Sequence, residues 1–96
     1  MTCEDALAAA IERAAAALGW HRLAEHLMDL GDIREAAGEY MPAWWCYVHA
    51  AECEREALYQ IPEEHARTRQ IIAGSAACCD FHADGLKARG GNGSGN

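Results

Sequence analysis

The sequence predicts an all-α protein: a compact antiparallel bundle of four to five helices with short connections. Alanine, the strongest helix former, is the most frequent residue, and β-branched residues are few. Apolar residues recur at helical spacing through most of the chain, and both prolines lie where a helix can begin. Amphipathic helices joined by a few residues fold back on one another, so a bundle is the expected architecture.

The amino-terminal part is expected to form two helices, over residues 3–18 and 20–30. Thr2 and Asp5 have the spacing of a capping box at the start of the first. Gly19 and Gly31 supply the two stop signals. The apolar stripes of these helices are Leu7, Ile11, Ala14 and Leu18 in the first, and Trp20, Leu23, Leu27 and Leu30 in the second.

Further helices complete the predicted bundle. A short one begins at the acidic signal of Asp32 and Glu35 and is broken or restarted near Pro42. The next covers residues 43–60, and the last starts at Pro62 and reaches about residue 87. Residues 1–88 are therefore predicted to form one domain, and residues 89–96, rich in glycine and asparagine, a flexible tail.

The charge balance excludes several classes of function. Fifteen acidic residues stand against eight basic ones, for a formal net charge of −7. Nucleic acids and anionic membrane surfaces are bound through clustered Lys and Arg, so we expect no direct contact with either. The five cysteines, an odd number, favour a reduced, cytoplasmic setting. We find no catalytic or cofactor motif and expect neither an enzyme nor a cofactor.

Two adjacent tryptophans give the most informative local pattern. Neighbouring residues on a helix point about 100° apart, so Trp44 and Trp45 cannot share a face. Trp44 aligns with apolar positions and is the predicted core anchor, whereas Trp45 aligns with polar ones. Either another helix covers Trp45, or Trp45 is an exposed anchor for a partner, as tryptophans at interface hot spots are.

Acidic residues gather around the expected position of Trp45. They are Glu52, Glu54, Glu56, Glu63 and Glu64. Such a run is either a solvated face or a carboxylate patch that docks on a basic protein surface, including one that normally holds nucleic acid. Together with Trp45, these residues form the predicted partner-binding site.

Cysteine and histidine residues at helical spacing suggest a different kind of site. The candidate ligands are Cys46, His49 and Cys53 on one helix, and Cys78 and His82 on the next. Thiolates and imidazoles from two facing helices can bind Zn²⁺ or Cu⁺. Buried cysteine is also among the commonest small core residues, so inert thiols are the leading interpretation and a metal site is the alternative.

Residues 20–43 resemble a single tetratricopeptide-like helical hairpin. Trp20, Leu23 and Leu27, followed by Ala36 and Tyr40, have the spacing of that motif. The chain departs from it where Ala24 replaces a glycine and where Leu27 replaces a tyrosine. The resemblance implies a helical hairpin here, and no second copy follows 34 residues later to make an array.

In size, charge and lack of motifs, the chain resembles small acidic inhibitors that phages and mobile elements encode, anti-CRISPR proteins among them. That resemblance implies an inhibitor that docks on a basic, nucleic-acid-binding surface of a host complex, and it transfers no site residues. The sequence therefore predicts a small acidic protein-binding module. The alternatives are a metal-binding helical bundle and a structural subunit that self-associates through Trp45, for example as a homodimer.

Overall fold

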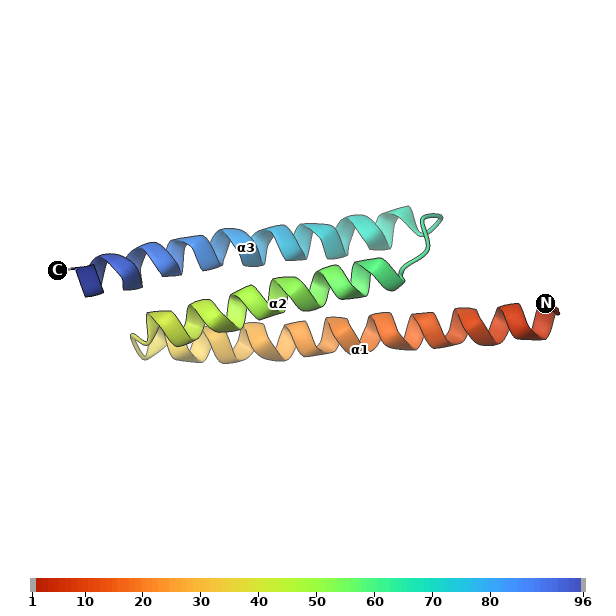
Figure 1. The fold of residues 1–96 in the computed structure, drawn as a ribbon, viewed down its shortest axis with the longest axis horizontal. Helices are drawn as coiled ribbons and strands as arrows, with labels where there is room; N and C mark the ends of the chain where they lie inside the picture. Colours follow the sequence, from red (N-terminus) through yellow and green to blue (C-terminus); the bar gives the residue numbers. More distant parts are fainter. Residues whose placement is uncertain (1, 96) are drawn as a thin grey trace.

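A computed structural model describes residues 2–95, with side chains up to Gly90, and within that range it contains three helices and no strand. Helix α1 spans Cys3–Ala36, α2 spans Tyr40–Gln60 and α3 spans Ala66–Gly95. Helix α2 lies between the other two and runs antiparallel to both (Figure 1). The all-α class is confirmed, whereas the predicted number of four to five helices is wrong.

The number differs because α1 is continuous where the sequence predicts breaks. Thr2 caps it as expected: its Oγ1 accepts the Asp5 backbone N–H at 3.1 Å, and the Asp5 carboxylate accepts the Thr2 N–H at 3.3 Å. Gly19 and Gly31, however, lie inside α1 rather than at helix ends. A glycine inside a helix costs about 1 kcal/mol, which the packing of α1 on α2 can outweigh.

Gly31 is a contact point between α1 and α2. It is buried, and a Cβ atom added there would lie 2.7 Å from Cε2 of Tyr47 and 3.2 Å from Cβ of Cys46. The missing side chain therefore lets the Tyr47 ring rest directly on the backbone of α1. Gly31, which is predicted from the sequence to end a helix, instead allows the close approach of two helices.

The first connection, residues 37–39, is a tight turn. Gly38 has a φ of +79°, in the left-handed region that glycine adopts without strain. Pro42 follows in the first turn of α2, where its missing N–H removes no intrahelical hydrogen bond. The restart predicted near Pro42 is thus the beginning of α2.

The second connection, residues 61–65, is held by a side chain of α3. Nη1 of Arg69 donates to the carbonyl oxygens of Leu58 and Ile61, at 2.9 Å and 2.5 Å. These bonds tie α3 to the end of α2, where the Leu58 oxygen also accepts the Ile61 backbone N–H at 3.1 Å. Helix α3 begins after this connection, at Ala66, rather than at Pro62 as predicted.

The core is built on one side of α2. That side packs against both α1 and α3, whereas α1 and α3 barely touch each other. The buried residues of the core are mostly alanines, which permit close helix contact, and its larger members include Tyr47 of α2 and Cys79 and Leu86 of α3. The molecule measures 63 × 19 × 16 Å, so it is elongated rather than compact.

Helices α1 and α3 are longer than α2 and project beyond it at opposite ends (Figure 1). Residues 2–15, at the start of α1, are all exposed. Much of the apolar stripe predicted to face a core is therefore on the surface. Large apolar residues left exposed on α1 and α3 include Leu7, Ile11, Leu18, Ile33, Ile71 and Phe81.

The carboxyl-terminal part of α3 includes most of the predicted tail. The helix takes in residues 89–95, Asn96 lies outside the described residues, and the flexibility of this segment stays a prediction. In the described part of the chain, no helix is long and apolar enough to cross a membrane.

Candidate functional site

The outer side of α2, opposite its buried face, carries the predicted anchor. Trp45 is 52% exposed, Met41 and Tyr59 are 44% and 80% exposed, and both Glu52 and Glu56 are exposed as well. At 100° per residue, these five positions fall within a stripe about 60° wide. We call this stripe the Trp45 surface: Met41, Trp45, Glu52, Glu56 and Tyr59.

A neighbouring histidine packs against the indole of Trp45. The ring centroids of Trp45 and His49 are 4.1 Å apart, with the planes inclined by 50°. Nδ1 of His49 lies 3.4 Å from a carboxylate oxygen of Glu52. The indole, the imidazole and the carboxylate thus form a row along the helix. An exposed side chain that is already held in place loses less conformational entropy when a partner covers it.

Trp44 has a different environment, as the sequence predicts. It is half-buried and packs against the core cluster. Nζ of Lys87 lies 5.9 Å from the centre of its ring, within the range of a cation–π contact. The division of the tandem into a core-packing tryptophan and an exposed one is therefore confirmed.

Glu54 does not belong to the partner-binding site, and this part of the prediction is wrong. The residue is 0% exposed, and its two carboxylate oxygens lie 2.8 Å and 3.1 Å from Nδ1 of His21 on α1. The reason is helix geometry, because Glu54 lies about 200° around the helix from Glu52. The spacing of two residues between Glu52, Glu54 and Glu56 could have predicted that Glu54 faces away from the other two.

Glu63 and Glu64 are exposed, but they lie in the connection between α2 and α3. The helix rises about 22 Å between Trp45 and Gln60, so these two acids are at the end of the molecule. Of the five glutamates predicted around the indole, only Glu52 and Glu56 accompany it on the outer side of α2.

The predicted cysteine and histidine ligands are not brought together in one site. Cys46 and Cys53 are buried, and burial raises the pKa of both thiols. His49 contacts Trp45 on the outer side of α2, and Cys78 is exposed on α3. This placement favours inert core thiols at Cys46 and Cys53.

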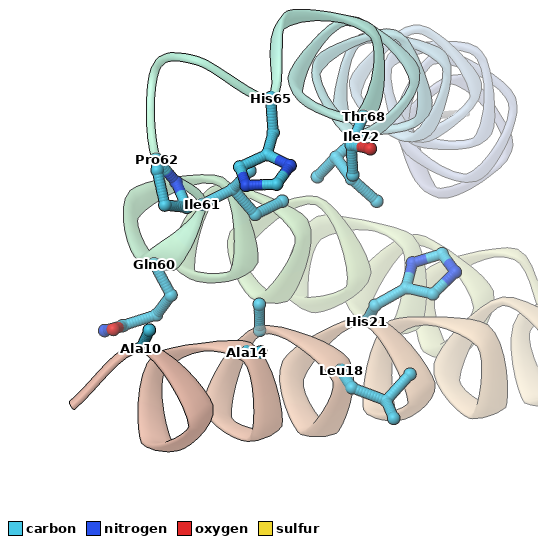
Figure 2. A pocket seen from close by; sticks show the side chains of 11 residues that line it. Ala10, Ala14, Leu18, His21, Gln60, Ile61, Pro62, His65, Thr68 and Ile72 are labelled. Carbon is cyan, nitrogen blue, oxygen red and sulfur yellow. The ribbon is translucent and has the colours of Figure 1, made fainter. Parts of the chain in front are cut away.

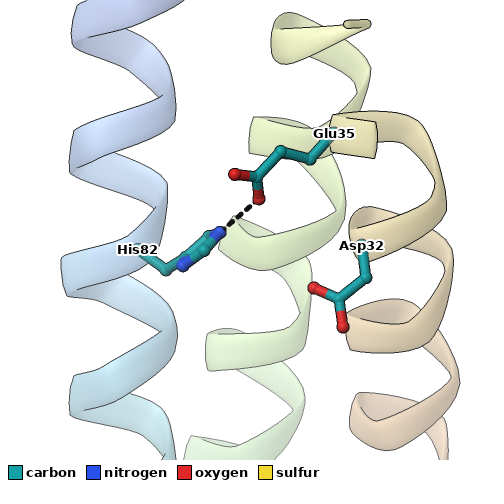
Figure 3. Close-up of side chains that lie close together, drawn as sticks. All are labelled: Asp32, Glu35 and His82. Atoms are coloured by element: carbon teal, nitrogen blue, oxygen red, sulfur yellow. Dashed lines mark hydrogen bonds and ion pairs between the residues drawn. The ribbon is translucent and has the colours of Figure 1, made fainter. Parts of the chain in front are cut away.

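Among the described residues, one group of three side chains of the kinds that bind metals lies close together. Of these three, only His82 was predicted from the sequence as a candidate ligand. The group consists of Asp32 and Glu35, one turn apart on α1, and His82, which faces them from α3 (Figure 3). The three ligand-type atoms all lie within 4.8 Å of one another. Because Glu35 and His82 are far apart in the sequence, the spacing of neighbouring residues could not predict this cluster.

Each member of the cluster already has a protein partner. Nε2 of His82 lies 2.6 Å from Glu35, Arg89 donates to Glu35 at 3.4 Å, and the Tyr47 hydroxyl donates to Asp32. Burial, with the hydrogen bond to Asp32, raises the pKa of Tyr47, which keeps that donor protonated. A cation at Arg89 also opposes a metal ion beside Glu35. We therefore interpret these residues as a polar clamp that joins the three helices.

Comparison with models of known families, with curated proteins and with solved structures found no match.

Proposed function

We propose that this chain is a small acidic protein-binding module that docks through the Trp45 surface on a basic protein surface. The observation that carries the proposal is the indole of Trp45, which is 52% exposed, held by His49 and flanked by acids. Tryptophan is the residue most typical of interface hot spots, and a polar surround is typical of their rims.

The charge around the indole supports a basic partner. Glu52 and Glu56 are exposed beside Trp45, within a chain of net charge −7. The one arginine of α2, Arg55, is paired with Asp80 at 3.0 Å, so its charge is locally balanced. A surface of this kind attracts a basic patch over a distance and accelerates the first encounter.

Basic patches on proteins are commonly the surfaces that hold nucleic acid. A small acidic chain that covers such a patch blocks it, which is how an inhibitor of a nucleic-acid-binding complex acts. The proposal is therefore an inhibitor of that class, and the contact requires no cofactor and no chemistry at a reacting bond.

The test is capture of partners from a lysate of the source organism by the immobilised full chain. The informative variants are Trp45→Ala and the double variant Glu52→Lys/Glu56→Lys. Each has a matched control: Trp20→Ala removes a partly exposed tryptophan of α1, and Glu63→Lys/Glu64→Lys makes the same charge change at the end of α2.

We expect one set of partners on the wild type and on both controls, and their loss from both informative variants. Raising the salt concentration should weaken capture, because the attraction between exposed charges is screened. If Glu63→Lys/Glu64→Lys weakens capture as much as Glu52→Lys/Glu56→Lys, net charge alone is responsible. Retention by all four variants would place the binding face elsewhere.

A further inference from the structure

A hollow lies between α1 and α3, just beyond the end of α2 (Figure 2). Its volume is about 340 Å³. Ala10, Ala14 and Leu18 form part of its wall on α1, and Ile61 and Ile72 face them from the other side. None of the described residues that line it is Asp, Glu, Lys or Arg. We call this hollow the α1–α3 groove.

The apolar surface continues past the groove along α1. Leu7 and Ile11 are 62% and 61% exposed, and at 100° per residue they share a stripe about 40° wide with Leu18. Ile71, which precedes the groove residue Ile72 on α3, is 61% exposed. Monomeric soluble proteins rarely leave a contiguous apolar patch of this kind uncovered.

The exposed area of the chain matches what a dimer would cover. The accessible surface is 6496 Å², whereas a folded monomer of 10.4 kDa exposes about 5,400 Å². The excess of about 1,100 Å² exceeds the roughly 800 Å² that each partner buries in a stable interface of standard size. One interface would therefore bring the exposed surface down to the usual value.

The charge distribution selects a second copy of this chain as the occupant. Two copies with net charge −7 repel each other, so they can associate only where charge is sparse. Residues 6–20 contain one acid, Glu12, and one base, Arg13, and thus carry no net charge. This segment of α1 both forms a wall of the groove and supplies the exposed apolar stripe.

We infer that the amino-terminal half of α1 from a second copy fills the α1–α3 groove, and that the exchange is reciprocal about a two-fold axis. The two α1 helices then run antiparallel, with alanines at the contact that let their backbones approach closely. The added helix covers the apolar stripe and closes the open side of the three-helix layer. The inference does not rest on the proposed function, because the groove and the Trp45 surface share no residue.

The test is the mass of the full chain in solution, measured by sedimentation equilibrium over a range of concentrations. The key variant is Ile11→Glu, which would place a carboxylate in the interface. Its matched control is Ile33→Glu on the same helix, where the side chain is 65% exposed and far from the groove. We expect a dimer for the wild type and for Ile33→Glu, and a dissociation constant at least about 100-fold higher for Ile11→Glu.

A second variant covers the case in which Ile11→Glu loses helicity by circular dichroism. Ala14→Trp fills the groove without adding charge, and it should also give a monomer. Several results would overturn the inference: a wild type that is monomeric up to about 100 µM, a dimer that survives both groove variants, or a dimer lost equally in Ile33→Glu or Trp45→Ala. A monomer that carries a co-purified apolar ligand by native mass spectrometry would assign the groove to that ligand instead.

Discussion

Two surfaces of the molecule present opposite chemistry. The outer side of α2 combines an exposed indole with Glu52 and Glu56, whereas the groove between α1 and α3, beyond the end of α2, is lined largely by apolar residues and by two histidines, His21 and His65. Contact through exposed acids weakens with salt, and contact through apolar helix faces does not. The difference suggests two separate tasks for one small chain: reversible docking on a basic partner, and assembly with itself.

The largest expected effect concerns His21, which lies on α1 at the groove. His21→Ala leaves the carboxylate of Glu54, which is 0% exposed, without its partner on α1. Removing the hydrogen-bond partner of a fully buried polar group leaves that group unsatisfied, and we expect a loss of about 3 kcal/mol in the free energy of unfolding. Urea denaturation of dilute protein measures it.

His49→Ala is the control on the outer side. Its imidazole contacts only exposed groups, so the free energy of unfolding should change by less than about 0.5 kcal/mol. Similar losses in both variants would show that the two histidines do not occupy different environments.

The next effect concerns adjacent thiols of α3. Burial, with a smaller contribution from Glu54, raises the pKa of Cys79 from 9.0 to about 11. The native state therefore keeps the Cys79 proton at a pH at which the unfolded chain has lost it. Stability from this group is complete below pH 9 and is lost as the pH rises towards 11, by about 2 kcal/mol at pH 10.5.

Urea denaturation at pH 8 and pH 10.5 measures this pH dependence. Cys79→Ala should lose about 2 kcal/mol less over that interval than the wild type. Cys78→Ala, which removes the exposed neighbour and only a minor contribution to the Cys79 pKa, should keep most of the wild-type dependence. An equal slope in all three proteins would contradict the effect assigned to burial of Cys79.

The adjacent tryptophans Trp44 and Trp45 allow the loss of stability to be compared between a half-buried and an exposed indole. Trp44 is half-buried against the core, so Trp44→Ala should cost about 2 kcal/mol, less than for a fully buried indole. Trp45→Ala removes a side chain that is 52% exposed and should cost less than about 1 kcal/mol. Thermal denaturation of the two variants side by side checks this difference, and equal losses would contradict it.

The fold class could be predicted from the sequence, whereas the length of the helices could not. The Thr2–Asp5 capping box and the start of a helix near Pro42 are local signals, and both are found in the structure. Gly19 and Gly31 are also local signals, but they mislead, because helix packing outweighs the modest cost of glycine. The apolar stripe of Leu7 and Ile11 predicts a buried face that the single chain does not bury.

The candidate site could be predicted in part, for a similar reason. The 100° step between adjacent helix residues assigns Trp44 and Trp45 to different environments, and the same rule places Glu54 away from Glu52. The partner of Glu54, in contrast, comes from another helix, and so does that of Glu35. Contacts between residues distant in the sequence depend on helix register, which no single segment specifies.

The smallest expected effect tests the register of α1 on α2 through its two internal glycines. Gly31→Ala places a Cβ atom 2.7 Å from the Tyr47 ring, so the ring must shift, and the variant should lose about 1 kcal/mol despite the better helix propensity of alanine. At Gly19 nothing lies within 4 Å of an added Cβ, and Gly19→Ala should gain up to about 1 kcal/mol. Urea denaturation of dilute protein measures both changes. The substitution is the same at both positions and improves helix propensity equally, so only the contact with Tyr47 can make the two changes opposite in sign. If both variants gain stability, Tyr47 does not rest on the backbone of α1.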